Sequence, residues 1–259
     1  MFYSDDWAYF RFQRTGSKII SWILTELENG QERKEELFLT VREPEILTHR
    51  RKQWLSSVRH PIPWNKSHYD TYKSGLLAGS DAVYFNLGLL FFPVDSQYNV
   101  IGDFTDLSGL VSFEEHLQKA YSCDLDKQLP MGHGHCLNPF IMNQLGIGIQ
   151  TYKFLDMFSK HPIRYFIEEE YTVDDLIREF DNYIMIDKFI IHDDNNLLQN
   201  TLTALEGCGI TYDGAALRKA TSMYSQNPKP EIDHSLAYSE NMTTLVLEKE
   251  RLIMEKFFN

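Results

Sequence analysis

The sequence has few cysteines, fewer basic than acidic residues, and no apolar run long enough to cross a membrane. Its three cysteines in 259 residues are odd in number and far apart, which excludes a disulfide framework and suits a reducing compartment. Lysine and arginine number 25 against 37 aspartates and glutamates, a formal net charge of −12. Because nucleic acids and acidic membranes are held by clustered cations, we expect no nucleic-acid partner and no broad membrane-binding surface.

The sequence also lacks a recognisable targeting segment. The first ten residues, MFYSDDWAYF, carry acids and aromatics where a signal peptide has a basic region followed by an apolar run. The longest apolar stretch, residues 82–94, is short and is interrupted by Asn86 and Gly88. These features predict a soluble, cytoplasmic protein with no membrane segment in this chain, although a catalytic domain trimmed of its anchor would have the same features.

What is present is the composition of an ordinary globular protein, with 43% hydrophobic and 24% charged residues. In the first quarter of the chain, apolar patterning predicts strands over residues 7–12, 37–41 and 54–58 and a helix over residues 19–27. Strands that alternate with helices favour a central parallel sheet flanked by helices. With no internal repeat and no linker, we predict a single α/β domain over residues 1–259.

The later part of the chain gives further helix and strand signals. The expected elements are a helix over 113–121 capped by Ser112, a helix after the capping sequence 172–175, a core strand over 183–186, a helix over 195–205 and a C-terminal helix. The region between residues 75 and 148 is punctuated by glycine, asparagine and aspartate, and its pattern is harder to interpret.

The turn between the first strand and its helix, residues 13–18 (QRTGSK), is the first candidate site. Such a turn directs successive backbone N–H groups at one point, where the helix dipole adds partial positive charge, and so can hold a phosphate. Arg14 and Lys18 add full charges, and Thr15 and Ser17 add hydroxyl groups. The turn lacks the earlier glycine that a Walker A loop has before Gly-Lys-Ser/Thr. The plain structural alternative is a tight turn with solvated cations.

A second candidate site follows the strand predicted over residues 54–58. Arg59 stands at its exit and is followed closely by Pro61, an arrangement that makes a rigid fork for a phosphate. If a helix begins after Pro61, Ser67 lies about two turns from Arg59 and can offer its hydroxyl to the same anion. The alternative is an ordinary strand-to-helix turn with a capping serine.

Together the two motifs resemble the sulfotransferase superfamily that uses 3′-phosphoadenosine 5′-phosphosulfate (PAPS). In that family, a [Lys/Arg]-[Thr/Ser]-Gly-x-[Thr/Ser] loop holds the 5′-phosphosulfate, and Arg-x-Pro-x-x-x-x-x-Ser-x-Tyr holds the 3′-phosphate. Residues 14–17 (RTGS), with Gly16 third, resemble the loop, and Arg59 with Ser67 resembles the second motif. Lys18 departs from the hydroxyl residue that the family has at its position.

Weaker similarities extend over much of the chain. Residues 112–115, 138–146 and 183–187 resemble the order seen in the carbohydrate-type branch of the superfamily. Residues 226–230 resemble the loop that closes over the nucleotide, and they make Lys229 a candidate nucleotide contact. The resemblance implies a P-loop-like sulfotransferase fold in which residues 14–18, Arg59, Ser67 and Lys229 bind the cofactor.

The implied reaction is transfer of a sulfuryl group from PAPS to a hydroxyl of a carbohydrate or other small-molecule acceptor, with no metal required. The product is 3′,5′-adenosine bisphosphate. Arg14 would stabilise charge on the leaving oxygen and not donate a proton, because arginine stays protonated. The acceptor hydroxyl needs a general base, which the family places just past the second strand. Glu43 is the first candidate and His49 the second; otherwise they are a solvated carboxylate and a surface helix residue.

Other functions stay open. Residues 132–136 (GHGHC), with His116 upstream, have the residue types of a zinc or copper site, but no second ligand pair follows, and we expect no metal. A P-loop-type kinase would share the strand, turn and helix but should show a Walker lysine and an acidic strand end. An inactive nucleotide-binding module of sulfotransferase fold is the non-enzymatic alternative. The acceptor and the oligomeric state cannot be read from the sequence.

Overall fold

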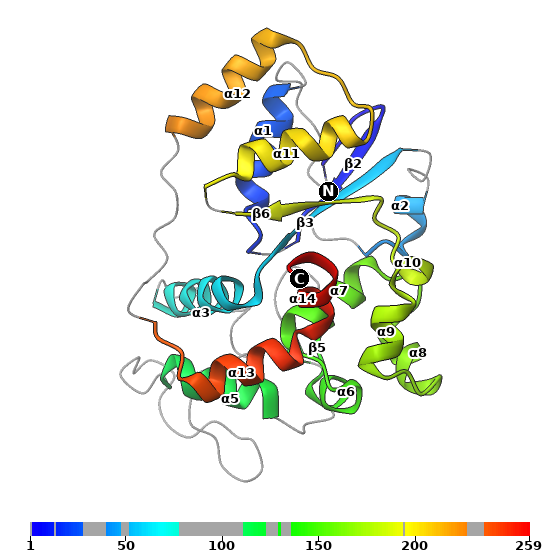
Figure 1. Ribbon diagram of the computed structural model, residues 1–259, viewed down its shortest axis with the longest axis vertical. Coiled ribbons are helices and arrows are strands. Elements are labelled where there is room, and N and C mark those ends of the chain that lie inside the picture. Colours follow the sequence, from blue (N-terminus) through cyan, green and yellow to red (C-terminus); the bar gives the residue numbers. More distant parts are fainter. Residues whose placement is uncertain are drawn as a thin grey trace. The chain divides into compact units, whose positions relative to one another are not determined.

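The fold is given by a computed structural model of the chain, shown in Figure 1. The residues that it describes are 2–12, 14–27, 40–47, 52–77, 111–122, 129–130, 136–193, 195–226 and 236–259. The chain is mixed α/β and forms two compact units. Unit 1 combines Met1–His60, Met157–Lys160 and Asp181–Glu231, and unit 2 combines Pro61–Asp156, His161–Phe180 and Ile232–Asn259. The single domain predicted over residues 1–259 stays a prediction.

A four-stranded sheet lies at the centre of unit 1. Its strands, in spatial order, are β1 (Phe2–Tyr3), β2 (Trp7–Phe10), β3 (Gln53–Arg59) and β6 (Lys188–His192). β1 pairs with β2 in the antiparallel sense, whereas β2, β3 and β6 run parallel. The carboxyl ends of these three strands therefore meet at one edge of the sheet. The predicted parallel sheet flanked by helices is confirmed.

Three helices pack together beside this sheet, as Figure 1 shows. They are α1 (Ser17–Leu27), α11 (Leu197–Gly207) and α12 (Gly214–Gln226). The apolar residues of α1 recur at intervals of three and four, which places them on one buried face of the helix. They pack with Tyr9, Leu55 and Ile190 of the sheet in one hydrophobic core. Because Ala216 and Ala220 are the buried residues of α12, that helix can approach α1 closely.

The other face of the sheet is lined by aromatic rings. Side chains alternate between the two faces of a strand, so Phe10 and Phe12 point away from Tyr9. Phe10 packs against Trp54 with ring centroids 5.0 Å apart, and Phe12 packs edge-on against Phe158 at 5.5 Å. Both faces of the sheet are thus covered by apolar groups, which is typical of parallel strands.

The strand predicted over residues 183–186 is wrong. Tyr183 ends the short helix α10 (Phe180–Tyr183), and the strand begins only at Lys188. Asp187 sets this start: its N–H donates to the Trp54 carbonyl at 2.8 Å, and its carboxylate accepts from the Trp54 N–H at 2.8 Å. The regular ladder with β3 starts with the next residue. The apolar pattern thus predicted a strand in the right region but about five residues too early.

Unit 2 is mainly helical. Its elements are α3 (Pro61–Leu77), α5 (Phe113–Ser122), β4 (Leu129–Pro130), β5 (Cys136–Leu137), α6 (Pro139–Leu145), most of α7 (Ile149–Phe158), α8 (Ile163–Glu168), α9 (Val173–Arg178), α13 (Glu240–Lys249) and α14 (Arg251–Phe257). The last two residues of α7, Met157 and Phe158, belong to unit 1. The helices expected after Pro61 and after Ser112 are confirmed, and the Ser112 hydroxyl accepts from the Glu115 N–H at 3.2 Å. Within the described part of the chain, no helix is long and apolar enough to cross a membrane.

A buried carboxylate organises the middle of unit 2. Glu250, which is fully buried, accepts hydrogen bonds from the N–H groups of Gln150 and Thr151 at 2.9 and 2.7 Å. The hydroxyl groups of Thr151 and Tyr121 donate to it at 2.7 and 2.9 Å. These donors include the first free N–H groups of α7, so Glu250 caps that helix from the far end of the chain. A side chain at Gly148 would clash with it, because a Cβ there would lie 2.2 Å from a Glu250 oxygen.

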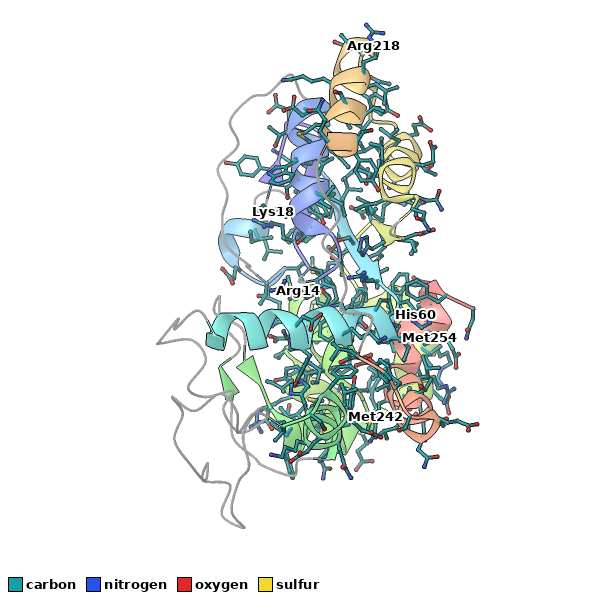
Figure 2. All side chains as sticks on the ribbon, turned by 90° about the vertical axis from the view of Figure 1, so that its left-hand side faces the viewer. Arg14, Lys18, His60, Arg218, Met242 and Met254 are labelled. Carbon is teal, nitrogen blue, oxygen red and sulfur yellow. The ribbon has the colours of Figure 1, made fainter. Side chains whose placement is uncertain are left out.

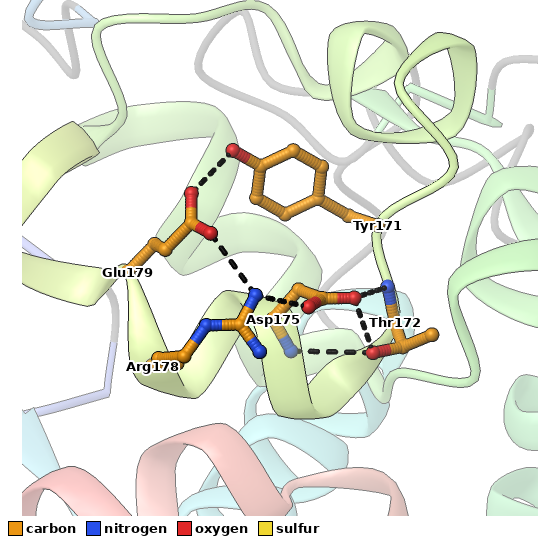
Figure 3. Close-up of polar contacts among 5 residues, drawn as sticks. All are labelled: Tyr171, Thr172, Asp175, Arg178 and Glu179. Atoms are coloured by element: carbon orange, nitrogen blue, oxygen red, sulfur yellow. Dashed lines mark hydrogen bonds and ion pairs between the residues drawn. The ribbon is translucent and has the colours of Figure 1, made fainter.

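The predicted capping sequence forms a capping box at the start of α9 (Figure 3). The Thr172 hydroxyl accepts from the Asp175 N–H, and the Asp175 carboxylate accepts from the Thr172 N–H at 2.9 Å. Arg178 bridges Asp175 and Glu179, and Glu179 accepts from the Tyr171 hydroxyl at 2.7 Å. The helix predicted after residues 172–175 is confirmed.

Candidate functional site

The turn between β2 and α1 contains two residues whose backbone lies in the left-handed region. Arg14 has φ 62° and Gly16 has φ 72°. The first is unusual for a residue other than glycine and costs about 1–3 kcal/mol, so the surrounding fold must hold it. The chain reverses here in a few residues, and α1 begins at Ser17 (Figure 2). The first N–H groups of an α-helix have no carbonyl partner within the helix, and this turn brings them to the sheet edge.

Gly16 is the position where the turn comes closest to its neighbours. A Cβ at this residue would lie 2.9 Å from Cδ2 of Leu197 and 3.0 and 3.1 Å from Cδ2 and Nε2 of His192. Both its positive φ and this space therefore require glycine. The His192 imidazole lies directly against the turn.

The side chain of Thr15 points into the protein and not toward the edge of the turn. Its hydroxyl donates to the Phe12 carbonyl at 2.7 Å and lies 2.6 Å from the Ser57 hydroxyl of β3. Ser57 in turn lies 2.7 Å from the hydroxyl of Tyr9. Burial raises the pKa of Tyr9, so this phenol is a neutral hydrogen-bonding partner. The buried hydroxyl of Thr15 anchors the turn on the sheet, which leaves its backbone N–H as the group to offer an anion.

Arg59 lies on the same face of the sheet as this anchor. It is the last residue of β3, two positions after Ser57, and alternate residues of a strand share a face. Its side chain is only 5% exposed. The hydrogen bond between Thr15 and Ser57 therefore brings the turn and Arg59 to one face and one edge of the sheet.

His192 joins these residues from the third parallel strand. It ends β6 and is the register partner of Arg59, so the two side chains stand beside each other on one face. Arg14, Arg59 and His192 thus follow or end three neighbouring parallel strands. In open α/β sheets, this carboxyl edge is the usual place for a ligand.

The other residues predicted to contact the nucleotide lie on α1, on α3 or outside the described part of the chain. Ser17 is the first residue of α1 and is half-buried. Lys18 is exposed, and its ammonium lies 4.9 Å from the centre of the Trp22 ring, one turn along the same helix. Ser67 is half-buried on α3 in unit 2, so its sharing of an anion with Arg59 stays a prediction. Lys229 lies outside the described residues.

Glu43 has a local structural role. It precedes the short helix α2 (Pro44–Leu47), and its carboxylate accepts from the Thr40 N–H at 3.1 Å. The segment is held to unit 1 by a hydrogen bond from the Val41 N–H to the Met157 carbonyl at 2.9 Å. Glu43 is half-buried, so one part of the carboxylate closes this turn and the side chain still reaches solvent. Its role as a base stays a prediction, and His49 lies outside the described residues.

The remaining predicted features can be placed only in part. Of the strand expected over residues 37–41, only residues 40–41 are described, and they form no strand. His116 is buried, with its ring 5.2 Å from that of Tyr69, and residues 131–135 lie outside the described part. The described residues contain no group of three His, Cys, Asp or Glu side chains that could hold a metal ion.

Comparison with known proteins adds no relative. No family model, no curated protein and no solved structure matches the chain.

Sequence reasoning missed two residues of this site, Ser57 and His192. Ser57 is polar in the middle of a buried strand, two residues before Arg59, and that alone was a usable signal. His192 was missed because the strand was expected at residues 183–186. Once the strand is placed at Lys188–His192, its last residue becomes a candidate by the same argument that selected Arg59.

Proposed function

We propose that this chain is a PAPS-dependent sulfotransferase with the fold of that superfamily. It would transfer a sulfuryl group to a hydroxyl of a carbohydrate or other small-molecule acceptor. The family motifs at residues 14–17 and at Arg59 support the proposal, because both belong to unit 1 and both lie at the carboxyl edge of its parallel sheet.

One observation carries the proposal: the 2.6 Å hydrogen bond between the Thr15 and Ser57 hydroxyls. It joins the turn to β3 two residues before Arg59, on the face to which Arg59 belongs. An adenosine with a phosphate at each end needs two anion contacts side by side, and a mononucleotide with one phosphate needs only one. The pairing of the turn with a buried cation, Arg59, therefore favours a bisphosphate nucleotide.

The chemistry follows from the residues. The acceptor oxygen attacks sulfur in line, a new O–S bond forms, and the S–O bond to the 5′-phosphate breaks. The electron pair goes to the leaving phosphate oxygen, where the turn's N–H groups and the Arg14 guanidinium stabilise the growing charge. Arg14 cannot give up its proton, so it acts electrostatically. The products are a sulfated acceptor and 3′,5′-adenosine bisphosphate.

The proton of the acceptor hydroxyl goes to a general base, and we assign this role first to Glu43 and second to His49. Glu43 is supported by its position in unit 1 and by its partial exposure. The Thr40 N–H donates to one oxygen of the carboxylate, and we assign the substrate proton to the other oxygen.

Thermal unfolding with nucleotides tests the proposal. We expect 3′,5′-adenosine bisphosphate to raise Tm well above the effect of ATP with Mg²⁺ at the same concentration, because ligands that bind only the folded state stabilise it. Incubation with PAPS and a panel of hydroxyl acceptors should then yield a sulfated product, detected by mass spectrometry together with the bisphosphate.

Two other results would favour a function other than sulfuryl transfer. A larger Tm shift with ATP and Mg²⁺ would contradict the sulfotransferase and favour a kinase. A kinase should have an acidic residue at a strand end, and Asp193 is the acid that follows β6. Both oxygens of its carboxylate already accept hydrogen bonds, from Asn195 at 2.9 Å and from Asn196 at 2.7 Å, which counts against that role. Binding of the bisphosphate without sulfuryl transfer to any acceptor would favour the inactive nucleotide-binding module.

A further inference from the structure

The titratable imidazole of His192 lies against the backbone of the turn at Gly16. The ring edge that carries Cδ2 and Nε2 faces Gly16, within 3.0 and 3.1 Å of where a Cβ would be. An anion held by the N–H groups that follow Gly16 would therefore come within reach of Nε2.

The position of this ring is fixed from two sides. The Leu197 side chain also meets Gly16, so the first residue of α11 packs beside the imidazole. The Asn200 amide donates to the Ile191 carbonyl at 2.8 Å, which ties α11 to the end of β6. His192 is half-buried, so the fold holds it and solvent still reaches it.

The charged groups around His192 are mainly cationic. Arg59 stands beside it on β3, and Arg14 belongs to the turn that it contacts. Asp193 follows it directly after the end of β6, but both oxygens of that carboxylate accept hydrogen bonds from the loop before α11. The first turn of α11, residues 197–200, contains no titratable side chain.

The first turn of α1 adds one more cation. Lys18 carries its charge over the Trp22 ring at 4.9 Å, along the helix. The Arg59 guanidinium on the neighbouring strand, with Arg14 in the adjoining turn, disfavours a further positive charge on the imidazole, whereas a phosphate dianion held by the turn favours it.

We propose that His192 is a proton-dependent contact for the phosphate that the turn holds. The imidazole is neutral in the free site, takes up a proton from solvent when the dianion binds, and then donates from Nε2 to a phosphate oxygen. This inference rests on the proposed function, because it needs the turn to hold a phosphate. It makes nucleotide affinity increase as pH falls through the neutral range, where histidine titrates.

Calorimetry of 3′,5′-adenosine bisphosphate binding tests the inference. Titrations at one pH in two buffers with different ionisation enthalpies measure the protons taken up on binding. We expect the wild-type protein to take up as much as about one proton more than His192→Gln. Between pH 8 and pH 6 its affinity should rise by as much as about tenfold relative to that variant. Because the phosphates themselves titrate near pH 6, only the difference between the two proteins is interpreted.

Two further variants test whether the difference in proton uptake comes from His192. His192→Asn provides a second neutral side chain if His192→Gln is poorly folded, and it should behave in the same way. His60→Gln removes the histidine that follows Arg59 and alternates to the other face of β3, and it should keep the wild-type proton uptake.

The outcomes separate the two proposals. Equal proton uptake by the wild type and both His192 variants, or loss of uptake in His60→Gln, would overturn the role of His192 while leaving the nucleotide site intact. Absence of bisphosphate binding by the wild-type protein would overturn the proposed function, and this inference with it.

Discussion

At the scale of single residues, Gly16 and Arg14 show what the site demands of the backbone. Both adopt positive φ within one turn, and only one of them is glycine. Arg14 adopts this conformation although it is a charged residue and not glycine. Gly16 stands where His192 and Leu197 leave no space for a Cβ atom. Strain held next to cationic groups and helix N–H donors is typical of a functional turn.

Replacing Gly16 tests this account of the turn. Gly16→Ala should destabilise the protein by about 1–2 kcal/mol for the positive φ and by about 1–3 kcal/mol more for the clash with Leu197 and His192. Gly209→Ala is the matched control, because Gly209 has φ 70° and nothing within 4 Å of an added Cβ. Urea unfolding measures both free energies.

Equal destabilisation by Gly16→Ala and Gly209→Ala would contradict the close contact between the turn and His192. Bisphosphate affinity gives a second readout. It should fall in Gly16→Ala and remain unchanged in Gly209→Ala.

At the scale of secondary-structure elements, helix ends were predicted well from sequence. Capping depends on residues three positions apart, so Thr172 with Asp175 and Ser112 with Glu115 could be recognised locally. The start of the strand Lys188–His192 could not be recognised in this way. It is set by Asp187 pairing with Trp54, more than a hundred residues away in sequence.

The α9 cap predicts an acid-sensitive helix end. The pKa of Asp175 is lowered to about 2, first by the hydrogen bond from the Thr172 hydroxyl and then by the Thr172 N–H and Arg178. A lowered carboxyl pKa contributes stability that is present above the unfolded value of 3.8 and is lost as pH falls through about 2. Asp175→Asn should therefore be less stable than wild type at about pH 6.

Denaturant unfolding at several pH values measures this effect. The stability difference between wild type and Asp175→Asn should shrink as pH falls from about 4 toward 2. Glu168→Gln, which removes an exposed carboxylate from α8 in the same unit, serves as the control. A difference for Asp175→Asn that does not change with pH would rule out the ionised capping box.

At the scale of the whole molecule, the charge distribution stands out. The chain carries a formal net charge of −12, yet the edge where β2, β3 and β6 end collects Arg14, Arg59 and His192. The two arginines concentrate positive charge locally, and His192 can add to it when it is protonated. Local positive charge in an acidic protein suits a small anion and not an extended polyanion.

The sequence could predict much of this arrangement but not all of it. Alternating strands and helices predicted the parallel sheet, and the two motifs singled out Arg14 and Arg59. What joins them, the hydrogen bond between Thr15 and Ser57, depends on the register of β2 against β3. Register is set by long-range packing, so neither the pairing of Ser57 with Thr15 nor the position of His192 could be derived from local patterns.

The central claim is that Arg59 holds a second phosphate beside the one held by the turn. Calorimetry of Arg59→Ala with 3′,5′-adenosine bisphosphate and with adenosine 5′-monophosphate tests it most directly. Arg178→Ala, which removes an arginine from the cluster in Figure 3, is the control for loss of a guanidinium. We predict that Arg59→Ala weakens the bisphosphate by about 10- to 100-fold, the cost of a charge-assisted contact, and leaves the monophosphate nearly unchanged. Equal losses for the two nucleotides would contradict the claim.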